Sequence, residues 1–344
     1  MNTEYTMEQV KRLCAIDSPS GFTERAADYL REELARLGYA PEKTRKGGVT
    51  VCLGGGAPER LDGLLLMAHV DTLGAVIQEV KGNGRLRLSP VGGLRAENCE
   101  AENCRIYTRE GKVYTGCLQL CNASVHVNRD YGAAKRKFDT VEVLIDEPVK
   151  SADETRALGI EVGDFVCFDP RTVITESGYI KSRFLDDKLS AAILLGYAKE
   201  LKEKKADPKR KVYLHFTVYE EVGHGAAAYV PEDVSEIVSV DMGCVGDGLK
   251  CTEREVSICA KDSGGPYDYT VTTALVNAAK EAEAAYAVDV YPFYGSDAEA
   301  ALSAGYDVRH GLIGPGVYAS HGYERSHIDG VENTLKLLWK FTVD

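Results

Sequence analysis

The fold class is set by the stretch "LDGLLLMAHVD", residues 61–71. Between Gly63 and His69 it holds only apolar residues, without any alternation of polar and apolar positions. Such a run predicts a strand that is buried on both faces. The glycine-bounded stretch "GVTVCLGG", residues 48–55, predicts a second strand just before it. A strand covered on both faces is typical of an α/β fold.

Helices and further strands surround this pair of strands in the sequence. Apolar residues recur at helical spacing over 6–16 and 23–39, and the breaker "DSPSG" (17–21) separates the two segments. After Pro170 the alternation of strand and helix resumes. We expect helices near residues 187–206, 270–285, 298–304 and 331–341, and strands near 212–219, 237–240 and 308–313. The pattern predicts a mixed sheet flanked by helices.

Residues 72–172 have a different pattern of polar and apolar residues. Polar and apolar residues alternate there, turns fall at sequences such as Gly-Asn-Gly (82–84), and no long helical pattern occurs. This predicts an all-β domain inserted into the α/β domain. We place the α/β domain at residues 1–72 plus 172–344, and the inserted, barrel-like β domain at 73–171.

The charge balance narrows the classes of partner. The 344-residue chain has a net charge of −12, and its charged segment 199–211 alternates in sign. Because phosphate binding requires a basic face, we expect no nucleic-acid partner. The N-terminal residues show no apolar signal core, and no segment is long enough to span a bilayer. We therefore expect no membrane partner and a cytoplasmic location.

The ten cysteines are expected to be free thiols, because a reducing cytosol does not favour disulfides. Four of them have a spacing loosely similar to that of a zinc ribbon, which is the alternative for this cluster: Cys99, Cys104, Cys117 and Cys121.

Polar side chains that can bind metal stand where the predicted strands end. Open α/β sheets bind ligands outside the carboxyl ends of their strands, so these positions are candidates for a site. Each alone has an ordinary explanation: Asp186 can cap the following helix, and Asp241 can start a turn. Their coincidence at successive strand ends favours a common site made of His69, Asp71, Asp186, Glu220, Glu221, Asp241 and His321.

The chemistry of this set is that of a dinuclear metal site. Two imidazoles and three carboxylates are the ligands that a pair of zinc-like divalent ions requires, with one carboxylate bridging. The adjacent Glu220 and Glu221 need a cation or a shared proton if both are buried. Asp71 lies two residues beyond His69, so we expect it to accept the other ring N–H of that histidine rather than to bind metal.

The same segments resemble motifs of the cocatalytic metallo-aminopeptidases of metallopeptidase family 42. This family contains the glutamyl and tetrahedral (TET) aminopeptidases, and endoglucanase-like names also occur in it. The resemblance covers essentially the whole chain and is carried in order by "AHVD" (68–71), "SPVGG" (89–93), "SRFLDDK" (182–188), "VYEEVGHGAA" (218–227), "VSVDMG" (238–243), "GSDA" (295–298) and "ASHGYERSH" (319–327). It implies a zinc-exopeptidase-like, phosphorylase/hydrolase-like fold and removal of N-terminal residues from peptides with a free N-terminus.

The resemblance also implies a role for each residue of the set. The implied metal ligands are His69 and Asp241 for one ion, Glu221 and His321 for the other, and Asp186 as the bridge. Glu220 becomes the general base, and Asp71 supports the catalytic site. The implied cofactor is two divalent ions per subunit, zinc first, with cobalt or manganese as alternatives.

Three positions depart from the family pattern or keep an alternative. Asp187 competes with Asp186 as the bridging ligand. The segment 319–327 lacks the common His-Ser-Pro, so His327 competes with His321. Lys188 stands where the family usually has an arginine.

The resemblance further implies a homo-oligomer, a dodecamer built from dimers, with the inserted domain providing oligomerisation contacts. We expect His126 of that domain to be a core or surface histidine rather than part of an active site. Two other functions are alternatives: a related dinuclear hydrolase of N-acyl or sugar substrates, and a non-catalytic metal-binding assembly protein. The second would not need Glu220.

Overall fold

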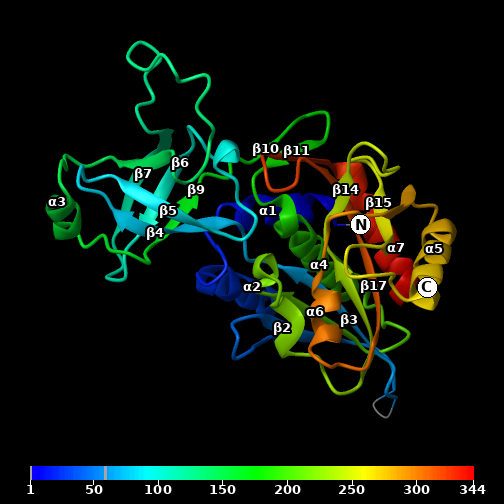
Figure 1. Ribbon diagram of the computed structural model, residues 1–344. Helices are drawn as coiled ribbons and strands as arrows, with labels where there is room; N and C mark the ends of the chain where they lie inside the picture. Colours follow the sequence, from blue (N-terminus) through cyan, green and yellow to red (C-terminus); the bar gives the residue numbers. More distant parts are fainter. Residues whose placement is uncertain (1, 58–59) are drawn as a thin grey trace. The chain divides into compact units, whose positions relative to one another are not determined.

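The computed structural model describes residues 2–57 and 60–344. The chain divides into two compact units (Figure 1). The first unit comprises the residues up to Asp71 together with Arg171–Asp344, and the second comprises Thr72–Pro170. In the described part of the chain, no helix is long and apolar enough to cross a membrane.

The first unit is built on a mixed sheet, to which the described residues contribute twelve strands. Three neighbouring strands at its centre run parallel: β12 (Val212–Thr217), β3 (Gly63–His69) and β13 (Val234–Val240). All residues of β3 are buried, as its unbroken apolar run predicts. The mixed sheet flanked by helices is thus confirmed.

Further strands extend this centre on both sides. Beyond β12 lie the antiparallel strands β2 (Val49–Gly54) and β1 (Glu42–Lys43). Beyond β13 lie the parallel strand β17 (Arg309–Tyr318) and then the antiparallel strands β18 (Glu324–His327), β11 (Tyr179–Ser182) and β10 (Val173–Ile174). The strands β14 (Gly243–Val245) and β15 (Val256–Lys261) also pair with β17, and β16 (Tyr286–Val290) pairs with β15.

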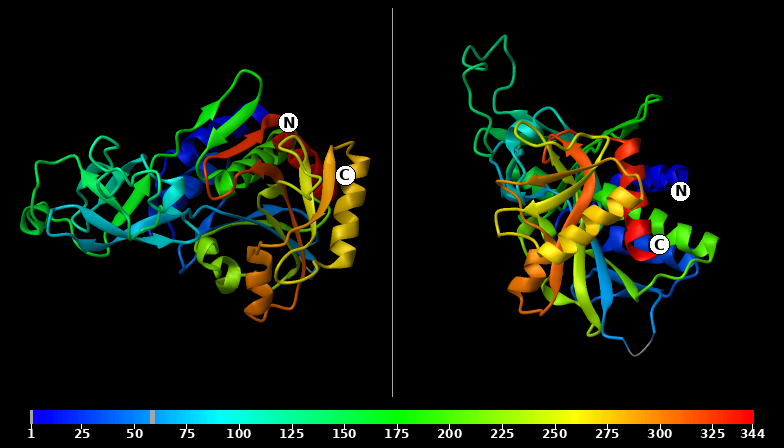
Figure 2. Two further views of the ribbon diagram at one scale, coloured as in Figure 1. Left: turned by 45° about the horizontal axis from the view of Figure 1, so that its top comes forward. Right: turned by 90° about the vertical axis from the view of Figure 1, so that its right-hand side faces the viewer.

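Alternate residues of β3 contribute to two cores on opposite faces of the sheet. Leu64 and Leu66 belong to the larger core, which also contains residues of α1 (Thr3–Cys14), α2 (Glu24–Arg36), α4 (Leu185–Lys204), α5 (Tyr269–Glu281) and α7 (Ile328–Thr342). Leu65 and Met67 belong to the smaller core, with residues of the 3₁₀ helix η3 (Gly225–Ala228) and of α6 (Asp297–Ser303). Figure 2 shows α6 and α4 on different sides of the strands.

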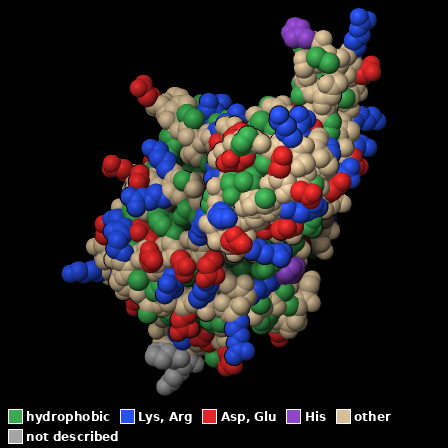
Figure 3. Space-filling model, turned by 90° about the vertical axis from the view of Figure 1, so that its left-hand side faces the viewer, with side chains coloured by type: hydrophobic (Ala, Val, Ile, Leu, Met, Phe, Trp, Pro, Cys, Tyr) green, Lys and Arg blue, Asp and Glu red, His purple; other side chains and the backbone are tan. Residues whose placement is uncertain are grey.

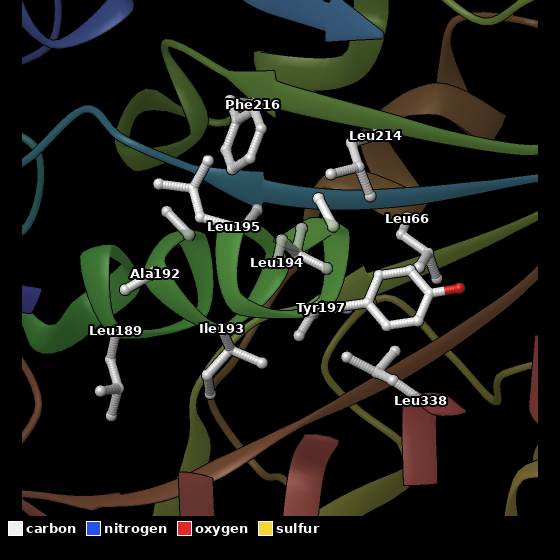
Figure 4. Packing of buried hydrophobic residues seen from close by; sticks show 14 of the residues in the cluster. Leu66, Leu189, Ala192, Ile193, Leu194, Leu195, Tyr197, Leu214, Phe216 and Leu338 are labelled. Carbon is white, nitrogen blue, oxygen red and sulfur yellow. The ribbon is translucent and has the colours of Figure 1, made fainter. Parts of the chain in front are cut away.

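The helix α4 is the centre of the larger core. Figure 4 shows its Leu195 on the side of Phe216 of β12 and its Ile193 on the opposite side of the helix. Its first residues are not helical, because Asp186 has φ −77° and ψ 102° and Asp187 has φ −119° and ψ 28°. The irregular start leaves two adjacent carboxylates ahead of a rigid, buried helix.

The second unit is a closed barrel of six described strands, all paired antiparallel. Around the barrel the order is β4 (Gly74–Val80), β5 (Leu86–Val91), β8 (Val141–Ile145), β7 (Val113–Leu120), β6 (Asn103–Tyr107) and β9 (Phe165–Phe168). Closure leaves no unpaired sheet edge. The only helix longer than one turn among its described residues is α3 (Ala152–Ala157). The inserted all-β architecture is therefore confirmed.

The histidine of the barrel unit is exposed, and its cysteines are free thiols. His126 is exposed in the segment between β7 and β8, so it is a surface histidine. The ten cysteines of the chain are free, as expected. Among residues 2–57 and 60–344, the groups of ligand atoms close enough to hold a metal do not include the cysteine cluster at 99–121, so the zinc-ribbon alternative is not supported.

Surface charge agrees with the expectation from composition. Figure 3 shows acidic and basic side chains interspersed over the face drawn, with no gathering of basic side chains into one patch. This face therefore offers no basic track of the kind that nucleic acids require.

Several elements differ from the sequence-based expectations. The strand expected at 212–219 ends at Thr217, because the chain turns there into the 3₁₀ helix η2 (Glu220–Val222). The strands β10, β11, β15, β16 and β18 were not predicted. They have two to six residues each, and pairing with another strand rather than a strong local pattern defines them.

Candidate metal centre

Polar side chains gather at the carboxyl ends of the three central strands. Because β3, β12 and β13 run parallel, their carboxyl ends lie at one edge of the sheet. The last residue of β3 is His69, and Asp241 follows β13 directly. Glu220 and Glu221 follow β12 after two connecting residues. The fold therefore explains why residues far apart in sequence meet here.

The imidazole of His69 is buried and held in one orientation. Its Nδ1 atom lies 2.9 Å from the backbone oxygen of Asp71, so Nδ1 carries the hydrogen and donates it there. The predicted acceptor was the Asp71 carboxylate, which is more distant at 3.6 Å. The Nε2 atom is left for other partners and lies 3.1 Å from Oδ1 of Asp186. This geometry leaves Nε2 directed at the acidic cluster.

Asp186 faces two histidines with its two carboxylate oxygens. Its Oδ1 atom is the one near His69, while its Oδ2 atom lies 3.7 Å from Nε2 of His321. The hydroxyl of Ser320 also donates to Oδ2, at 2.9 Å. The Nε2 atom of His321 lies 3.5 Å from Oε2 of Glu221 as well. Asp186 is thus placed between the two imidazoles of the predicted set.

Asp187 lies fully buried beside the same cluster. Neither of its carboxylate oxygens has a hydrogen bond of normal geometry to a described residue, although the Ser190 hydroxyl is near enough to lower its pKa. Burial and the charge of Asp241 outweigh that hydroxyl and raise the pKa of Asp187 well above its ordinary value. A carboxyl group in these surroundings is either protonated or paired with a cation.

The glutamate pair is held through its backbone rather than through its side chains. The chain turns at Tyr219, which has a left-handed φ of 71°, and then enters η2. The backbone N–H groups of Glu220 and Glu221 donate to the two oxygens of Asp71, at 3.1 Å and 3.3 Å. The hydroxyl of Ser20 donates to the same carboxylate at 2.5 Å. Asp71 therefore fixes the turn that presents both glutamates.

Burial and mutual repulsion dominate the electrostatics of the cluster. Burial raises the pKa of Glu220 well above its ordinary value; His69 opposes this and Asp241 adds to it. Burial and the charge of Asp186 raise the pKa of Glu221 in the same direction. Burial, with the charge of Asp186, raises the pKa of Asp241 to about 7. Burial acts to lower the pKa of His69, but its hydrogen bond to Asp186 and the nearby carboxylates hold it well above the ordinary value.

The donor set fits divalent cations. Two groups of three side chains place one ligand atom each within 4.8 Å of one another, and His69 belongs to both. The first group is His69, Asp187 and Asp241, and the second is His69, Asp186 and Glu221. Carboxylate oxygens and imidazole nitrogens are ligands of zinc-type ions, and such ions offset the accumulated negative charge. Of the two alternative positions weighed in the sequence, Asp187 lies inside this cluster.

The other alternative position, His327, is engaged elsewhere. Its Nδ1 atom accepts the backbone N–H of Asp329 at 3.0 Å, at the start of α7. Its Nε2 atom lies 2.8 Å from the carbonyl oxygen of Ser177 and donates to it. Both ring nitrogens of His327 are thus used in capping and loop contacts. Lys188, where the family pattern usually has arginine, is fully buried and donates from Nζ to the carbonyl oxygen of Ile16 at 2.6 Å.

The sequence analysis did not identify some residues that lie at this centre. Glu324 and Ser320 contact the segments of Asp186 and His321, and nothing local marks either residue as special. The "GSDA" segment was noted, and its Asp297 accepts the backbone N–H of Ala226 at 2.7 Å. A Cβ atom on Gly225 would lie 2.2 Å from the Asp297 carboxylate, which explains why residue 225 is a glycine.

Comparison with known proteins indicates what this centre belongs to. The sequence pattern described as M42 glutamyl aminopeptidase matches residues 47–337. The chain belongs to the M42 glutamyl aminopeptidase family. It is 43% identical over 336 residues to the putative aminopeptidase YhfE of Bacillus subtilis (strain 168), which covers 98% of this chain and 96% of YhfE. This M42 protein is thus an aminopeptidase, a hydrolase acting on peptide bonds.

Solved structures show the same fold. Aminopeptidase APDkam598 from the archaeon Desulfurococcus kamchatkensis matches with a TM-score of 0.88 and 24% identity, over 99% of this chain and 95% of that one. PhTET1-12s, a dodecamer, matches with a TM-score of 0.83 and 23% identity, over 98% of both chains. The family and fold that the motifs implied are therefore confirmed for this M42 chain.

Proposed function

We propose that this M42 protein is a dinuclear metal-dependent aminopeptidase whose two ions lie at the carboxyl ends of β3, β12 and β13. The observation that carries the proposal is the placement of Asp186, whose two oxygens face different histidines, His69 and His321. A carboxylate between two imidazoles from separate segments is suited to bridging two ions. The remaining ligands of the proposal are Asp241 on the His69 side and Glu221 on the His321 side.

Ions bound there would supply a water of lowered pKa and a Lewis acid for the scissile carbonyl. Glu220 is the residue that accepts the proton of this water and later donates it to the leaving amine. Its Oε2 atom lies 3.7 Å from Nε2 of His69, next to the cluster. Burial raises the pKa of Glu220 above its ordinary value, so its carboxylate is a stronger base than that of an exposed glutamate. The Asp71 carboxylate keeps Glu220 in place by accepting the backbone N–H of Glu220.

The substrate is proposed to be a peptide with a free N-terminus. The carboxylates of the cluster can hold a protonated or metal-bound α-amine, and an acetylated amine would lose this interaction. Activity is tested on a panel of aminoacyl p-nitroanilides and on their N-acetylated counterparts. We expect release of nitroaniline from the unblocked amides alone, loss of activity with chelator, and recovery with zinc, cobalt or manganese. Chelator-resistant hydrolysis, or equal cleavage of the blocked amides, would overturn the proposal.

Zinc is the proposed metal, because imidazole and carboxylate ligands together suit it. The proposed stoichiometry of two ions per chain rests on Asp186, whose two oxygens face His69 and His321. Elemental analysis of protein purified without added metal, and again after equilibration with zinc, measures both identity and count. One ion per chain at saturation would contradict the dinuclear proposal.

We also infer that one part of the chain is catalytic and the other serves oligomerisation, and that the protein is cytoplasmic. Residues 1–72 plus 172–344 form the proposed catalytic domain, since both ligand groups come from them. The barrel within 73–171 is the proposed oligomerisation domain of a dodecamer built from dimers, by analogy with the PhTET1-12s dodecamer. The ten free thiols suit a reducing compartment. Light scattering at micromolar protein measures the assembly, and a monomer there would refute it.

A further inference from the structure

Glu324 is a buried glutamate at the first position of β18. Its side chain is only 2% exposed. In the register of the sheet it lies opposite Ser182, the last residue of β11. Because β11 leads directly into the turn that carries Asp186, this pairing brings Glu324 beside that turn. Glu324 also lies three positions after His321, and His321 is in the turn between β17 and β18.

The carboxylate of Glu324 joins these two turns through their backbones. Its Oε2 atom accepts the N–H of Asp186 at 3.0 Å, and its Oε1 atom accepts the N–H of His321 at 3.0 Å. The backbone N–H of Leu185 is also close enough to lower the pKa of this carboxyl group. Each oxygen therefore serves a different segment, and the two segments lie more than 130 positions apart in the sequence.

Both turns adopt backbone conformations that need support. His321 has a φ of 64° and Ala319 a φ of 59°, and Phe184, just before the Asp186 turn, has a φ of 68°. A residue with a side chain adopts this left-handed region at a cost and keeps it only when the surroundings fix it. Glu324 contacts the N–H of His321 itself and the N–H groups that follow Phe184. It is thus placed to maintain both turns.

We infer that Glu324 is a positioning residue of the metal centre, which sets the spacing between Asp186 and His321 without binding metal itself. The inference rests on the proposed function, in which these two residues are ligands. Asp71 offers a parallel in the same protein, because its two oxygens accept the backbone N–H groups of Glu220 and Glu221. Two carboxylates would then hold the cluster through backbone N–H groups. Asp71 binds the glutamate turn, and Glu324 binds the turns of Asp186 and His321.

The test compares Glu324→Gln with a control substitution of another buried carboxylate that accepts two backbone N–H groups. Asp289 is 6% exposed, and its two oxygens accept the backbone N–H groups of Lys250 and Cys251, each at 2.9 Å. Neither residue is a proposed ligand, so Asp289→Asn reports the stability cost of weakening such a carboxylate. In each variant an amide nitrogen replaces one acceptor oxygen, so one of the two backbone bonds is lost.

Zinc affinity and stoichiometry of the full-length chains are measured by competition with a chromophoric chelator, and melting temperatures are recorded with chelator present. We expect Glu324→Gln to bind zinc about 10- to 100-fold more weakly, the usual effect of removing a group that orients ligands. Its kcat at limiting zinc should fall and should recover in excess zinc, with KM little changed. Asp289→Asn should melt earlier to a similar extent but keep wild-type zinc affinity.

Unchanged zinc affinity in a folded Glu324→Gln variant would overturn the inference, and so would an equal loss of affinity in Asp289→Asn. If Glu324→Gln does not fold, Glu324→Asp, which keeps the charge on a shorter side chain, replaces it under the same criteria. Failure of both variants to fold in saturating zinc would also overturn the inference, because Glu324 would then be a determinant of the fold. Absence of zinc binding in the wild-type chain would instead refute the proposed function.

Discussion

The backbone N–H of Glu220 donates to Oδ1 of Asp71 over 3.1 Å, so the position of this glutamate does not depend on its own side chain. Its carboxylate stays available, with Oε2 3.7 Å from Nε2 of His69. The neighbouring Glu221 directs its carboxylate to His321 instead. Two adjacent glutamates are thereby given different surroundings, as the proposed division into general base and ligand requires.

Substitutions at this pair should separate catalysis from metal binding. Glu220→Gln should keep two ions and nearly unchanged KM, while kcat falls by about 10²- to 10⁴-fold, or roughly 3–5 kcal/mol, because a general base is lost. Glu221→Gln should lose metal as well as activity. Elemental analysis and steady-state kinetics on the same preparations decide this. Near-full activity of metal-loaded Glu220→Gln would contradict the assigned roles.

The adjacent aspartates provide a test of the bridging ligand. Asp186→Asn should weaken binding of both ions, because its oxygens face His69 and His321. Asp187→Asn should affect at most the ion near His69 and Asp241, the group to which it belongs. Zinc titration that resolves two binding steps measures the difference. If Asp187→Asn abolishes both steps while Asp186→Asn leaves one intact, the bridge is Asp187.

Gly225 should not tolerate a side chain. A Cβ atom there would lie 2.2 Å from Oδ1 of Asp297, which binds the start of η3 just after the glutamate pair. Gly225→Ala should therefore destabilise the protein by about 1–3 kcal/mol, the typical cost of overpacking, and lower kcat. Gly246→Ala is the matched control, because a Cβ atom at Gly246 meets nothing within 4 Å. Equal stability of the two variants would show that η3 moves without cost.

His215 on β12 should contribute a loss of stability in mild acid. Burial, with the charge of Lys46, lowers its pKa from 6.5 to about 4, and Tyr229 packs edge-on against its ring. The unfolded chain therefore takes up this proton at higher pH than the folded chain does. The contribution is present in full above pH 6.5 and is lost as pH falls through about 4, by about 3 kcal/mol.

Urea unfolding at pH 7 and pH 4.5, with chelator present so that metal loss does not contribute, measures this effect. His215→Phe should have a smaller stability difference between the two pH values than the wild type. His126→Gln serves as the control, because it removes an exposed histidine. An unchanged pH dependence in His215→Phe would show that other groups account for the acid sensitivity.

Local patterns were sufficient for some elements and not for others. The apolar run of β3 and the alternation of the barrel strands are properties of the sequence itself, so both could be predicted. The strands β11 and β18 depend on pairing between segments about 145 residues apart, such as Ser182 and Glu324, which no local window contains. The position of Glu324 in the site follows from that pairing. Long-range register therefore limited the prediction of the site as well as of the fold.

The proposed metal ligands that could be predicted share one property: they end or follow strands or open a helix, where an open α/β sheet places its binding residues. His69 and Asp241 are of this kind. The acceptor of the His69 ring N–H was predicted incorrectly as the Asp71 carboxylate. The carbonyl of the same residue accepts it, because the carboxylate is occupied by Ser20 and the glutamate turn. Such competition between acceptors is visible only in three dimensions.

The burial of α4 from Leu185 to Leu201 has a consequence for sequence variation. Between Leu185 and Leu201 nearly every side chain is buried, whereas α2 buries only Ala26, Ala27, Leu30, Glu33 and Leu34. Selection on random substitutions should then remove changes at successive codons over this part of α4. Along α2 the intolerant codons should recur every three or four positions, with freely varying codons between them.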